Sequence, residues 1–285
     1  MKRSLILALG LGGAALVAAI GSGVTRSSAS APRPDIALSG ELTQGGWARG
    51  TVPAGTKALT LDGKPVAVAP DGGFFVAFDR DAGAQAQLVA RLADGSTATR
   101  TLTVSPRAWK LEYIPLGPKP GTPPSEAFRI RRAAELAQIN AARAIDSGSQ
   151  GWRQRFVWPA RGRLSGMFGS QRIYNGTPGS YHSGTDIAGG AGAPITAPAD
   201  GVVILAAVSP FTLEGNLLMI DHGMGLNSAF LHCSQILVRQ GEAVKQGQIV
   251  GRIGMTGRAT GPHLHWSIKW RDSRLDPILF TGPMN

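Results

Sequence analysis

The chain is poor in cysteine and in aromatic residues, and the first shortage excludes a disulfide-stabilised fold. A single cysteine, Cys233, occurs in 285 residues, so no disulfide can form within the chain and stability must come from packing or a bound metal. Only 6% of the residues are aromatic, whereas 39 are glycine. This composition favours small β-rich domains with many turns over helical bundles.

Acidic residues are also scarce, and the formal net charge is +11. Removing residues 1–31 leaves 26 basic and 18 acidic residues, a net charge of +8. A basic protein is attracted to nucleic acid, an anionic membrane surface or an acidic cell-wall polymer, although such a charge also serves solubility. Because no run of lysine and arginine is interleaved with aromatic residues, no nucleic-acid partner is expected.

Beyond residue 31, no stretch is long and apolar enough to cross a bilayer. Residues 1–31 are laid out as a signal peptide: two basic residues precede an uncharged apolar run over 5–20, and Ala29-Ser30-Ala31 resembles a cleavage site. Pro32 would hinder cleavage there, so an uncleaved segment that anchors the chain in a membrane stays open as an alternative. We therefore predict export, most simply to the periplasm.

Residues 35–105 alternate apolar and polar positions in short runs, separated by turn signals such as Asp62-Gly63 and Asp94-Gly95. This pattern predicts a small antiparallel β-sandwich, immunoglobulin-like in general shape. The segment contains no histidine and no acidic cluster. Its expected role is spacing, binding or covering of another domain.

Residues 106–150 are predicted to form a proline-rich linker and a helix. Six prolines between 106 and 124 indicate a stiff, extended segment. Thr122 and Pro123 suit a helix N-cap and first helical position, and Ser147-Gly148-Ser149 ends the helical pattern. Helical spacing predicts a packed apolar face made of Ile130, Ala134, Ala137, Ala141 and Ile145.

Residues 151–285 are rich in glycine and in short apolar runs, with no long helical pattern, so we expect a compact antiparallel β domain. Residues Gly241 to Gln248 also have the turn-and-strand pattern of biotinyl-like or lipoyl-like carriers. A carrier needs a modifiable lysine at an exposed hairpin tip, and Lys245 is expected inside a strand. The pattern therefore argues against a carrier.

All five histidines lie in this last segment, and four of them fall in informative patterns. His182 and Asp186 form H-x-x-x-D, and His263 and His265 form H-x-H, beginning 77 residues after Asp186. Residues two apart in a strand face the same side, and His232 ends a third strand-like run. Catalytic zinc commonly takes three His or carboxylate ligands and leaves one position for water. Spacing alone leaves open which of the histidines bind metal and which move protons.

Two neighbouring candidates receive structural interpretations. His222 is interpreted as a structural residue at a turn. Cys233 directly follows His232, but adjacent side chains in a strand point to opposite faces, so a Cys-His nucleophile is not expected.

Residues 166–285 resemble the lysostaphin-type zinc metallopeptidases, the bacterial cell-wall endopeptidases. The resemblance is carried by 168–169, 182–188, 197–203, 221–223, 230–232, 244–251, 256–257 and 261–266. It implies that His182, Asp186 and His265 bind one zinc ion per chain. It also implies that His232 and His263 activate the water and stabilise the charge that develops on the tetrahedral intermediate.

One position departs from the family pattern, which commonly has tyrosine where this chain has Phe230. If that position only packs, nothing changes, whereas a required hydroxyl could come from Tyr174 or Tyr181 near the first ligand.

The resemblance implies a zinc metalloendopeptidase, a peptidoglycan hydrolase that cuts cross-links between stem peptides. The alternative is a non-catalytic module of the same fold that binds peptidoglycan or regulates another hydrolase, and the intact ligand set argues against it. Since metal ligands must be unprotonated, activity is expected to fall in acid.

Overall fold

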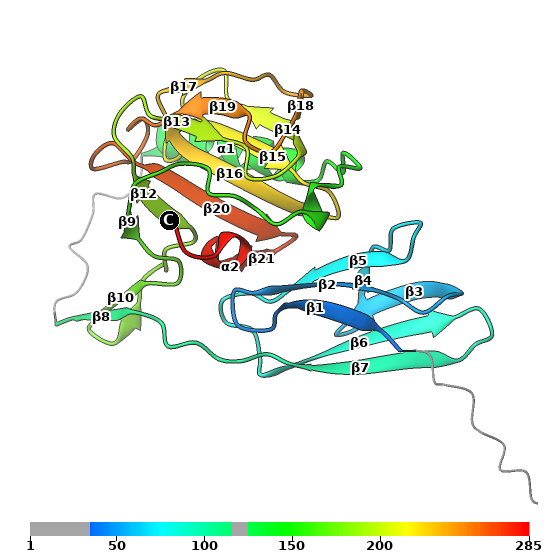
Figure 1. Cartoon of the computed structure of the whole chain (residues 1–285). Coiled ribbons are helices and arrows are strands. Elements are labelled where there is room, and N and C mark those ends of the chain that lie inside the picture. The colour runs from blue at the N-terminus through cyan, green and yellow to red at the C-terminus, as the bar shows by residue number, and fades with distance from the viewer. Residues whose placement is uncertain (1–34, 116–124, 285) are drawn as a thin grey trace, which may run out of the picture. The chain divides into compact units, whose positions relative to one another are not determined.

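The computed structural model describes residues 35–115 and 125–284 (Figure 1). The predicted signal segment 1–31 and part of the predicted linker lie outside the described residues. None of the described helices is long and apolar enough to span a membrane.

Residues 35–105 form two antiparallel sheets, as predicted (Figure 1). The three-stranded sheet has the order β1-β2-β5 and comprises β1 (Ala37–Glu41), β2 (Trp47–Thr51) and β5 (Gly73–Ala77). The four-stranded sheet has the order β4-β3-β6-β7 and comprises β4 (Lys64–Val66), β3 (Thr56–Leu61), β6 (Gln85–Leu92) and β7 (Thr97–Thr103). Asp62 and Gly63 both have positive φ, the geometry of the tight hairpin turn that their sequence predicts.

The core between these sheets follows the alternation of the strands. In β6, Ala86, Leu88 and Ala90 are buried and the residues between them are more exposed. Leu59 of β3 and Phe74 of β5 belong to the same apolar cluster, so side chains of both sheets meet in one core.

Part of the predicted linker is a paired strand. Strand β8 (Leu111–Ile114) pairs in parallel with β10 (Gln171–Tyr174), which also pairs with β11 (Thr177–Pro178). The extended conformation was predictable from the prolines, but the pairing depends on a partner about sixty residues further along the chain. The division of the chain at residues 105 and 150 remains a prediction.

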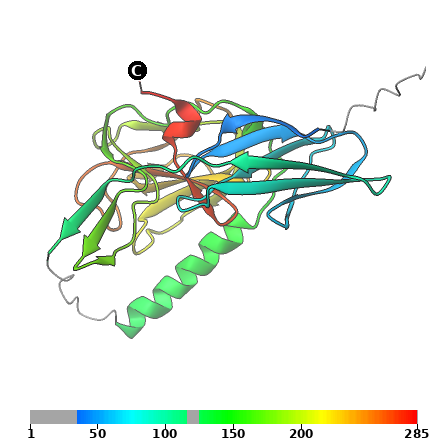
Figure 2. The same ribbon diagram turned by 90° about the horizontal axis from the view of Figure 1, so that it is seen from below.

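Helix α1 (Glu126–Arg143) is capped by Ser125, whereas the predicted cap Thr122 lies outside the described residues. The Ser125 side-chain oxygen accepts a hydrogen bond from the Phe128 N–H at 3.1 Å. Figure 2 shows α1 as a single long helix, and its Ile139 and Ala142 pack in an apolar cluster with residues of β14 to β16.

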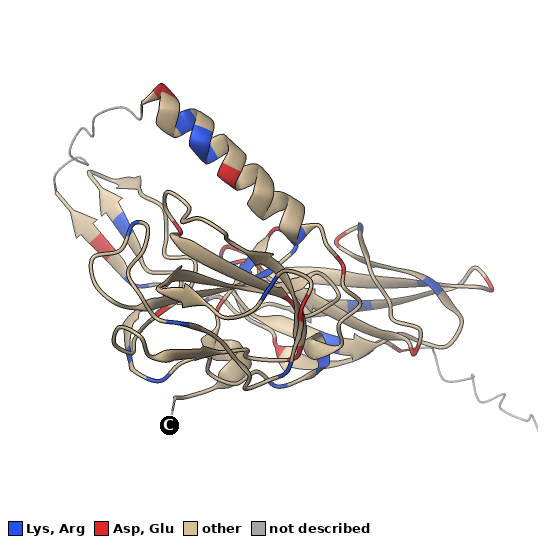
Figure 3. Ribbon diagram, turned by 90° about the horizontal axis from the view of Figure 1, so that it is seen from above, with Lys and Arg blue, Asp and Glu red and all other residues tan. Residues whose placement is uncertain are grey.

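The predicted face of this helix was wrong. Ile130 is 63% exposed and Ile145 is 41% exposed, whereas Glu135, Ile139 and Ala142 are buried. The cause is Glu135, whose carboxylate accepts hydrogen bonds from Thr212 and pairs with two arginines of the helix. Figure 3 shows acidic and basic residues side by side along α1. Hydrophobic periodicity cannot predict which face of a helix is buried when that burial depends on ion pairs.

The main sheet of residues 151–284 follows the order β18-β14-β15-β16-β20-β12-β9, with β21 paired to β20. Its strands are β9 (Arg163–Gly166), β12 (Thr185–Ala188), β14 (Gly201–Ala206), β15 (Asn216–Asp221), β16 (Leu226–Cys233), β18 (Ala243–Val244), β20 (Leu264–Trp270) and β21 (Ser273–Leu275). All of these pairings are antiparallel, so the predicted β fold is confirmed.

A second, three-stranded sheet of order β13-β19-β17 contains β13 (Pro194–Thr196), β19 (Ile249–Arg252) and β17 (Gln235–Ile236). The described helices of this half are the 3-10 turn Gly151–Arg153 and the short α2 (Ile278–Thr281). Lys245 lies one residue beyond β18 and pairs with Asp200 at 3.0 Å, so its predicted place inside a strand was wrong.

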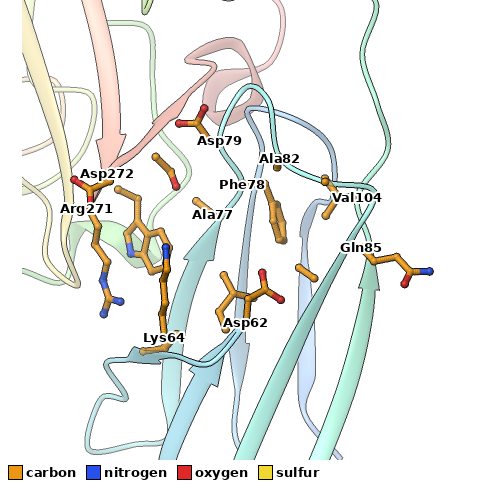
Figure 4. Close-up of a pocket in the computed structure, with 16 residues that line it drawn as sticks. Asp62, Lys64, Ala77, Phe78, Asp79, Ala82, Gln85, Val104, Arg271 and Asp272 are labelled. Atoms are coloured by element: carbon orange, nitrogen blue, oxygen red, sulfur yellow. The ribbon is translucent and has the colours of Figure 1, made fainter.

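The N-terminal sheets contact the C-terminal half through aromatic residues. The Trp47 indole donates to the carbonyl of Leu279 at 3.0 Å, and the Phe75 ring lies 6.3 Å from that of Trp270. Beside this contact is a cavity of about 330 Å³, lined by residues of both parts, including Phe78 and Arg271 (Figure 4).

Candidate metal centre

Strand pairing brings the predicted metal ligands together. In the antiparallel pair of β12 and β20, Asp186 lies directly opposite His265. On the other side of β20, Leu231 of β16 is paired with His265. His182 lies in the loop that leads into β12. Three neighbouring segments therefore deliver these side chains to one face, as the spacing predicted.

The three candidate ligand atoms are close to one another. His265 Nδ1 lies 2.8 Å from Asp186 Oδ1, and His182 Nε2 lies 3.1 Å from both of those atoms. Two atoms bound to one tetrahedral zinc at about 2.0–2.2 Å lie roughly 3.3 Å apart. Two imidazole nitrogens and one carboxylate oxygen at this spacing fit a zinc ion that keeps one position for water.

Surrounding backbone orients these ligands. His182 Nδ1 lies 3.2 Å from the Met167 carbonyl, which assigns the ring proton to Nδ1 and leaves the Nε2 lone pair for a metal. A Cβ added at Gly166 would collide with the Asp186 carboxylate, and one added at Gly184 would lie 2.7 Å from His265 Nε2. Glycine is therefore required where the backbone passes beside the ligands.

The electrostatics keep the carboxylate ionised. Burial alone would raise the pKa of Asp186, but hydrogen bonds from His182 and His265 outweigh it and hold the pKa well below its usual range. Burial lowers the pKa of His265 against the opposing effect of Asp186. For His182, burial is outweighed by Asp186 and the pKa is raised. A proton on either imidazole would compete with a metal for the same lone pair.

His232 and His263 lie beside this cluster. Their ring centroids are 4.9 Å apart, and His263 Nε2 is 3.9 Å from Asp186 Oδ1. His232 Nδ1 lies 2.8 Å from the Thr256 carbonyl, and His263 Nδ1 lies 2.8 Å from the Gly261 carbonyl. Both contacts assign a proton to Nδ1, so Nε2 of each neutral ring is available to accept one.

His232 adopts an uncommon backbone conformation. Its φ of 64° lies in the left-handed region, which costs a residue other than glycine about 1 kcal/mol or more. The main-chain N–H donates to the Glu214 carbonyl at 2.8 Å. Burial lowers the pKa of the His232 ring, which favours its neutral form near pH 7.

A cleft of about 410 Å³ opens over these residues. Its lining includes all five predicted site residues together with Tyr181, Ser183, Leu213, Glu214, Leu231, Arg258, Ala259 and Thr260. The cluster is therefore accessible to a substrate.

Two other candidates lie outside the cluster. His222 is fully buried, with Nδ1 2.9 Å from the Asp200 carbonyl and Nε2 2.9 Å from the Ser228 hydroxyl. Cys233 is also fully buried, and burial raises the pKa of its thiol to about 12. A thiol with that pKa is not a nucleophile near neutral pH.

Of the aromatic residues near the site, Phe230 is buried, whereas Tyr174 and Tyr181 line open hollows. Phe230 is fully buried opposite Trp266 in the β16–β20 pair, so this position only packs. Tyr181 lines the cleft, and the guanidinium carbon of Arg274 lies 5.6 Å from the centre of its ring. Tyr174 lines the adjoining hollow.

Sequence reasoning missed the residues that support the site through their backbone. Main-chain carbonyls hold the histidines in place, namely those of Met167, Thr256, Gly261 and Glu214. Because every residue has such a carbonyl, the residue types do not reveal which ones do so. Arg258, a wall residue of the cleft, was also missed although it lies five residues before His263.

Comparison with known proteins gives a consistent result. The family model for peptidase family M23 matches residues 180–277. A solved structure of a protein assigned to peptidase M23 from Pseudomonas aeruginosa is 30% identical, with a TM-score of 0.64 over 86% of this chain and 96% of the other.

Curated relatives match part of this chain. Peptidoglycan DD-endopeptidase ShyA of Vibrio cholerae is 36% identical over 132 residues, 46% of this chain and 30% of ShyA. Cell division protein DipM of Caulobacter vibrioides is 31% identical over 202 residues, 67% of this chain and 30% of DipM. The chain thus spans about 30% of the length of these relatives. By the fold, the motifs and the extent of the match, the chain belongs to peptidase family M23.

Proposed function

We propose that the protein is a zinc-dependent endopeptidase that hydrolyses peptide cross-links of peptidoglycan. The observation that carries the proposal is the meeting of His182 Nε2, Asp186 Oδ1 and His265 Nδ1 at the base of an open cleft. A zinc ion bound there lowers the pKa of its water towards about 7 and supplies a nucleophile at neutral pH.

In this mechanism the other two histidines handle protons. The free Nε2 of His232 or His263 accepts the proton that the attacking water loses. A ring protonated at Nε2 then donates a hydrogen bond to the oxyanion of the tetrahedral intermediate. When the C–N bond breaks, the same proton passes to the leaving amine. The products are one free carboxylate and one free amine.

The substrate assignment rests on similarity to peptidoglycan DD-endopeptidases. We expect cleavage of cross-links that involve diaminopimelate and D-alanine, not of glycine bridges. Peptidoglycan lies outside the cytoplasmic membrane, so this function requires export, for which residues 1–31 are the proposed signal. If that signal is not cleaved, it would anchor the enzyme to the membrane.

The competing candidate is a non-catalytic module that binds peptidoglycan or regulates another hydrolase. It is favoured by one relative, DipM, whose name states a role in cell division and no peptidase activity. The complete His-Asp-His set argues against it, because a module that only binds has no need of three ligand atoms within 3.1 Å of one another.

The test is to measure zinc content and muropeptide release for the wild type and for His265→Ala. We expect one zinc per chain and conversion of cross-linked dimers to monomers, with both lost in the variant. Zinc without cleavage would favour the regulatory module. Digestion of purified sacculi that released only glycine-bridge products would overturn the assignment of the bond.

A further inference from the structure

The cleft over the metal centre continues into a second hollow of about 660 Å³. The two share Tyr181, His182 and Arg258, so one continuous groove runs past the first ligand. The walls of the second hollow come from β9, β10 and the segment around β8, including Lys110 and Glu112. A peptide whose scissile bond lies over the metal centre would extend into this hollow.

The second hollow carries an excess of positive charge. Its lining contains Lys110, Arg172 and Arg258 against a single acid, Glu112. Arg172 Nε lies 2.9 Å from the Glu112 carboxylate, so these two charges are paired. Among residues 35–115 and 125–284, no carboxylate lies within ion-pair distance of Lys110 or Arg258. Two unpaired cations therefore face the groove.

Both cations extend from backbone that is held in place. The Arg258 N–H donates to the Leu213 carbonyl at 3.0 Å, and the Lys110 carbonyl accepts from the Gln171 N–H at 3.0 Å. Lys110 directly precedes β8, whose parallel pairing with β10 places it along the groove. A cation on a fixed backbone loses less freedom on binding an anion than one on a mobile loop.

We infer that this hollow is a carboxylate-binding site, in which Arg258, assisted by Lys110, holds a free carboxylate of the peptide substrate close to the bond that is cut. The inference rests on the proposed function and specifies its substrate class: peptides with a free carboxylate next to the scissile amide. A planar guanidinium binds a carboxylate through two parallel hydrogen bonds, and the ammonium adds a point charge.

The test compares cross-linked muropeptide dimers whose diaminopimelate carboxylate is free with dimers in which it is amidated. We expect Arg258→Ala to lower kcat/KM about tenfold on the free-carboxylate dimer, mainly through KM, and to leave the amidated dimer nearly unchanged. Lys110→Ala should lower kcat/KM by a smaller factor, again on the free-carboxylate dimer and not on the amidated one. Lys57→Ala, an exposed cation on β3, is the matched control for net charge.

A binding experiment separates failure of this inference from failure of the proposed function. In the His265→Ala background, calorimetry should find the free-carboxylate dimer bound more tightly than the amidated one, and Arg258→Ala should abolish that difference. Equal effects of Arg258→Ala on both dimers, in kinetics and in binding, would overturn the inference. A wild type that binds no zinc and cleaves neither dimer, yet keeps the binding difference, would refute only the peptidase.

Should Arg258→Ala fold poorly by urea denaturation, Arg258→Lys serves in its place. Arg258→Lys keeps the positive charge but cannot form two parallel hydrogen bonds to a carboxylate. We therefore expect kcat/KM on the free-carboxylate dimer to lie between those of the wild type and Arg258→Ala, with the amidated dimer nearly unchanged. If Arg258→Lys and Lys110→Ala each affected the free-carboxylate and amidated dimers equally, the assignment would be contradicted.

Discussion

The guanidinium of Arg80 donates two hydrogen bonds to the main-chain carbonyl of Gly169, from Nε at 3.2 Å and from Nη2 at 3.0 Å. Nη2 also donates to Gln171 Oε1 at 2.9 Å, and the side chain is only 7% exposed. Arg80 belongs to the turn between β5 and β6, whereas the Gly169 N–H donates to the carbonyl of the proposed metal ligand His182 at 2.8 Å. The N-terminal sheets thus support the segment that positions the first ligand.

Replacing Arg80 should therefore weaken zinc binding. In Arg80→Ala, the Gly169 carbonyl and the Gln171 amide lose their buried donor, which costs about 1–3 kcal/mol of folding stability. We expect zinc affinity to fall about tenfold, because losing a residue that holds a metal ligand in place usually weakens metal binding by this factor or more. Competition with a chromophoric chelator measures the affinity.

Arg91→Ala, an exposed arginine of β6, is the matched control and should leave zinc affinity unchanged. If Arg80→Ala loses stability but keeps the zinc affinity of the wild type, Arg80 supports the fold and not the ligand.

Zinc binding and catalysis should separate at His232. Because this residue has positive φ, His232→Asn is the better variant, since asparagine tolerates the left-handed region. We expect zinc content to stay at one per chain while kcat falls by a factor of about 10²–10⁴, the usual contribution of a general acid or base. Loss of zinc together with activity would instead make His232 part of the metal site.

Stability should depend on pH through His222. Burial lowers the pKa of this ring to about 4, whereas a histidine in the unfolded chain titrates near 6.5. Between these values the unfolded state binds more protons, so stability falls as the pH is lowered through this window and the loss is complete below it. The expected loss is about 3 kcal/mol.

The measurement is urea unfolding at pH 7.5, 5.5 and 4.5 for the wild type and His222→Gln, both with a chelator so that the metal ligands contribute equally. The variant should be less stable at pH 7.5 but should lose less on acidification. Parallel pH profiles would show that His222 does not carry this dependence.

The sequence predicted which residues would lie together at the candidate site because that information is local. His263 and His265 are two apart in a strand, and Leu264 between them is fully buried on the opposite face, as alternation requires. The even spacing of the H-x-x-x-D pattern likewise predicted that His182 and Asp186 lie together. The alternation of apolar and polar residues did not predict the register of β12 against β20. This register places Asp186 opposite His265, and it depends on the whole sheet.

The features that were missed depend on contacts distant in sequence. Strand β8 pairs with β10 across about sixty residues, and Arg80 reaches Gly169 across 89. In α1, an apolar stripe suggested one face, but the desolvated acid Glu135 fixed another. Hydrophobic periodicity predicts the burial of apolar side chains only. It does not predict the burial of a polar side chain whose partners lie elsewhere in the chain.

The buried acid of α1 provides the last prediction. Glu135 Oε1 accepts from the Thr212 N–H at 2.6 Å and from the Thr212 hydroxyl at 2.7 Å, and Arg132 joins Glu135 to Glu214 through Nη1. Burial would raise the pKa of Glu135, but the hydrogen bonds from Thr212 and the arginines together lower it, so the carboxylate stays charged.

This network ties α1 to the loop whose Glu214 carbonyl accepts from the His232 N–H. Glu135→Ala leaves the Thr212 donors and Arg131 Nε without their acceptor, while Arg132 keeps its bonds to Glu214, so we expect a loss of about 1–3 kcal/mol in urea unfolding. Amide hydrogen exchange should accelerate at Thr212 and His232 before the rest of the sheet, since the loop is released locally. Glu135→Gln keeps an acceptor for Thr212 and should show a smaller change at both amides. Faster exchange spread evenly over the sheet would mean that Glu135 stabilises the fold as a whole and does not hold this wall of the cleft.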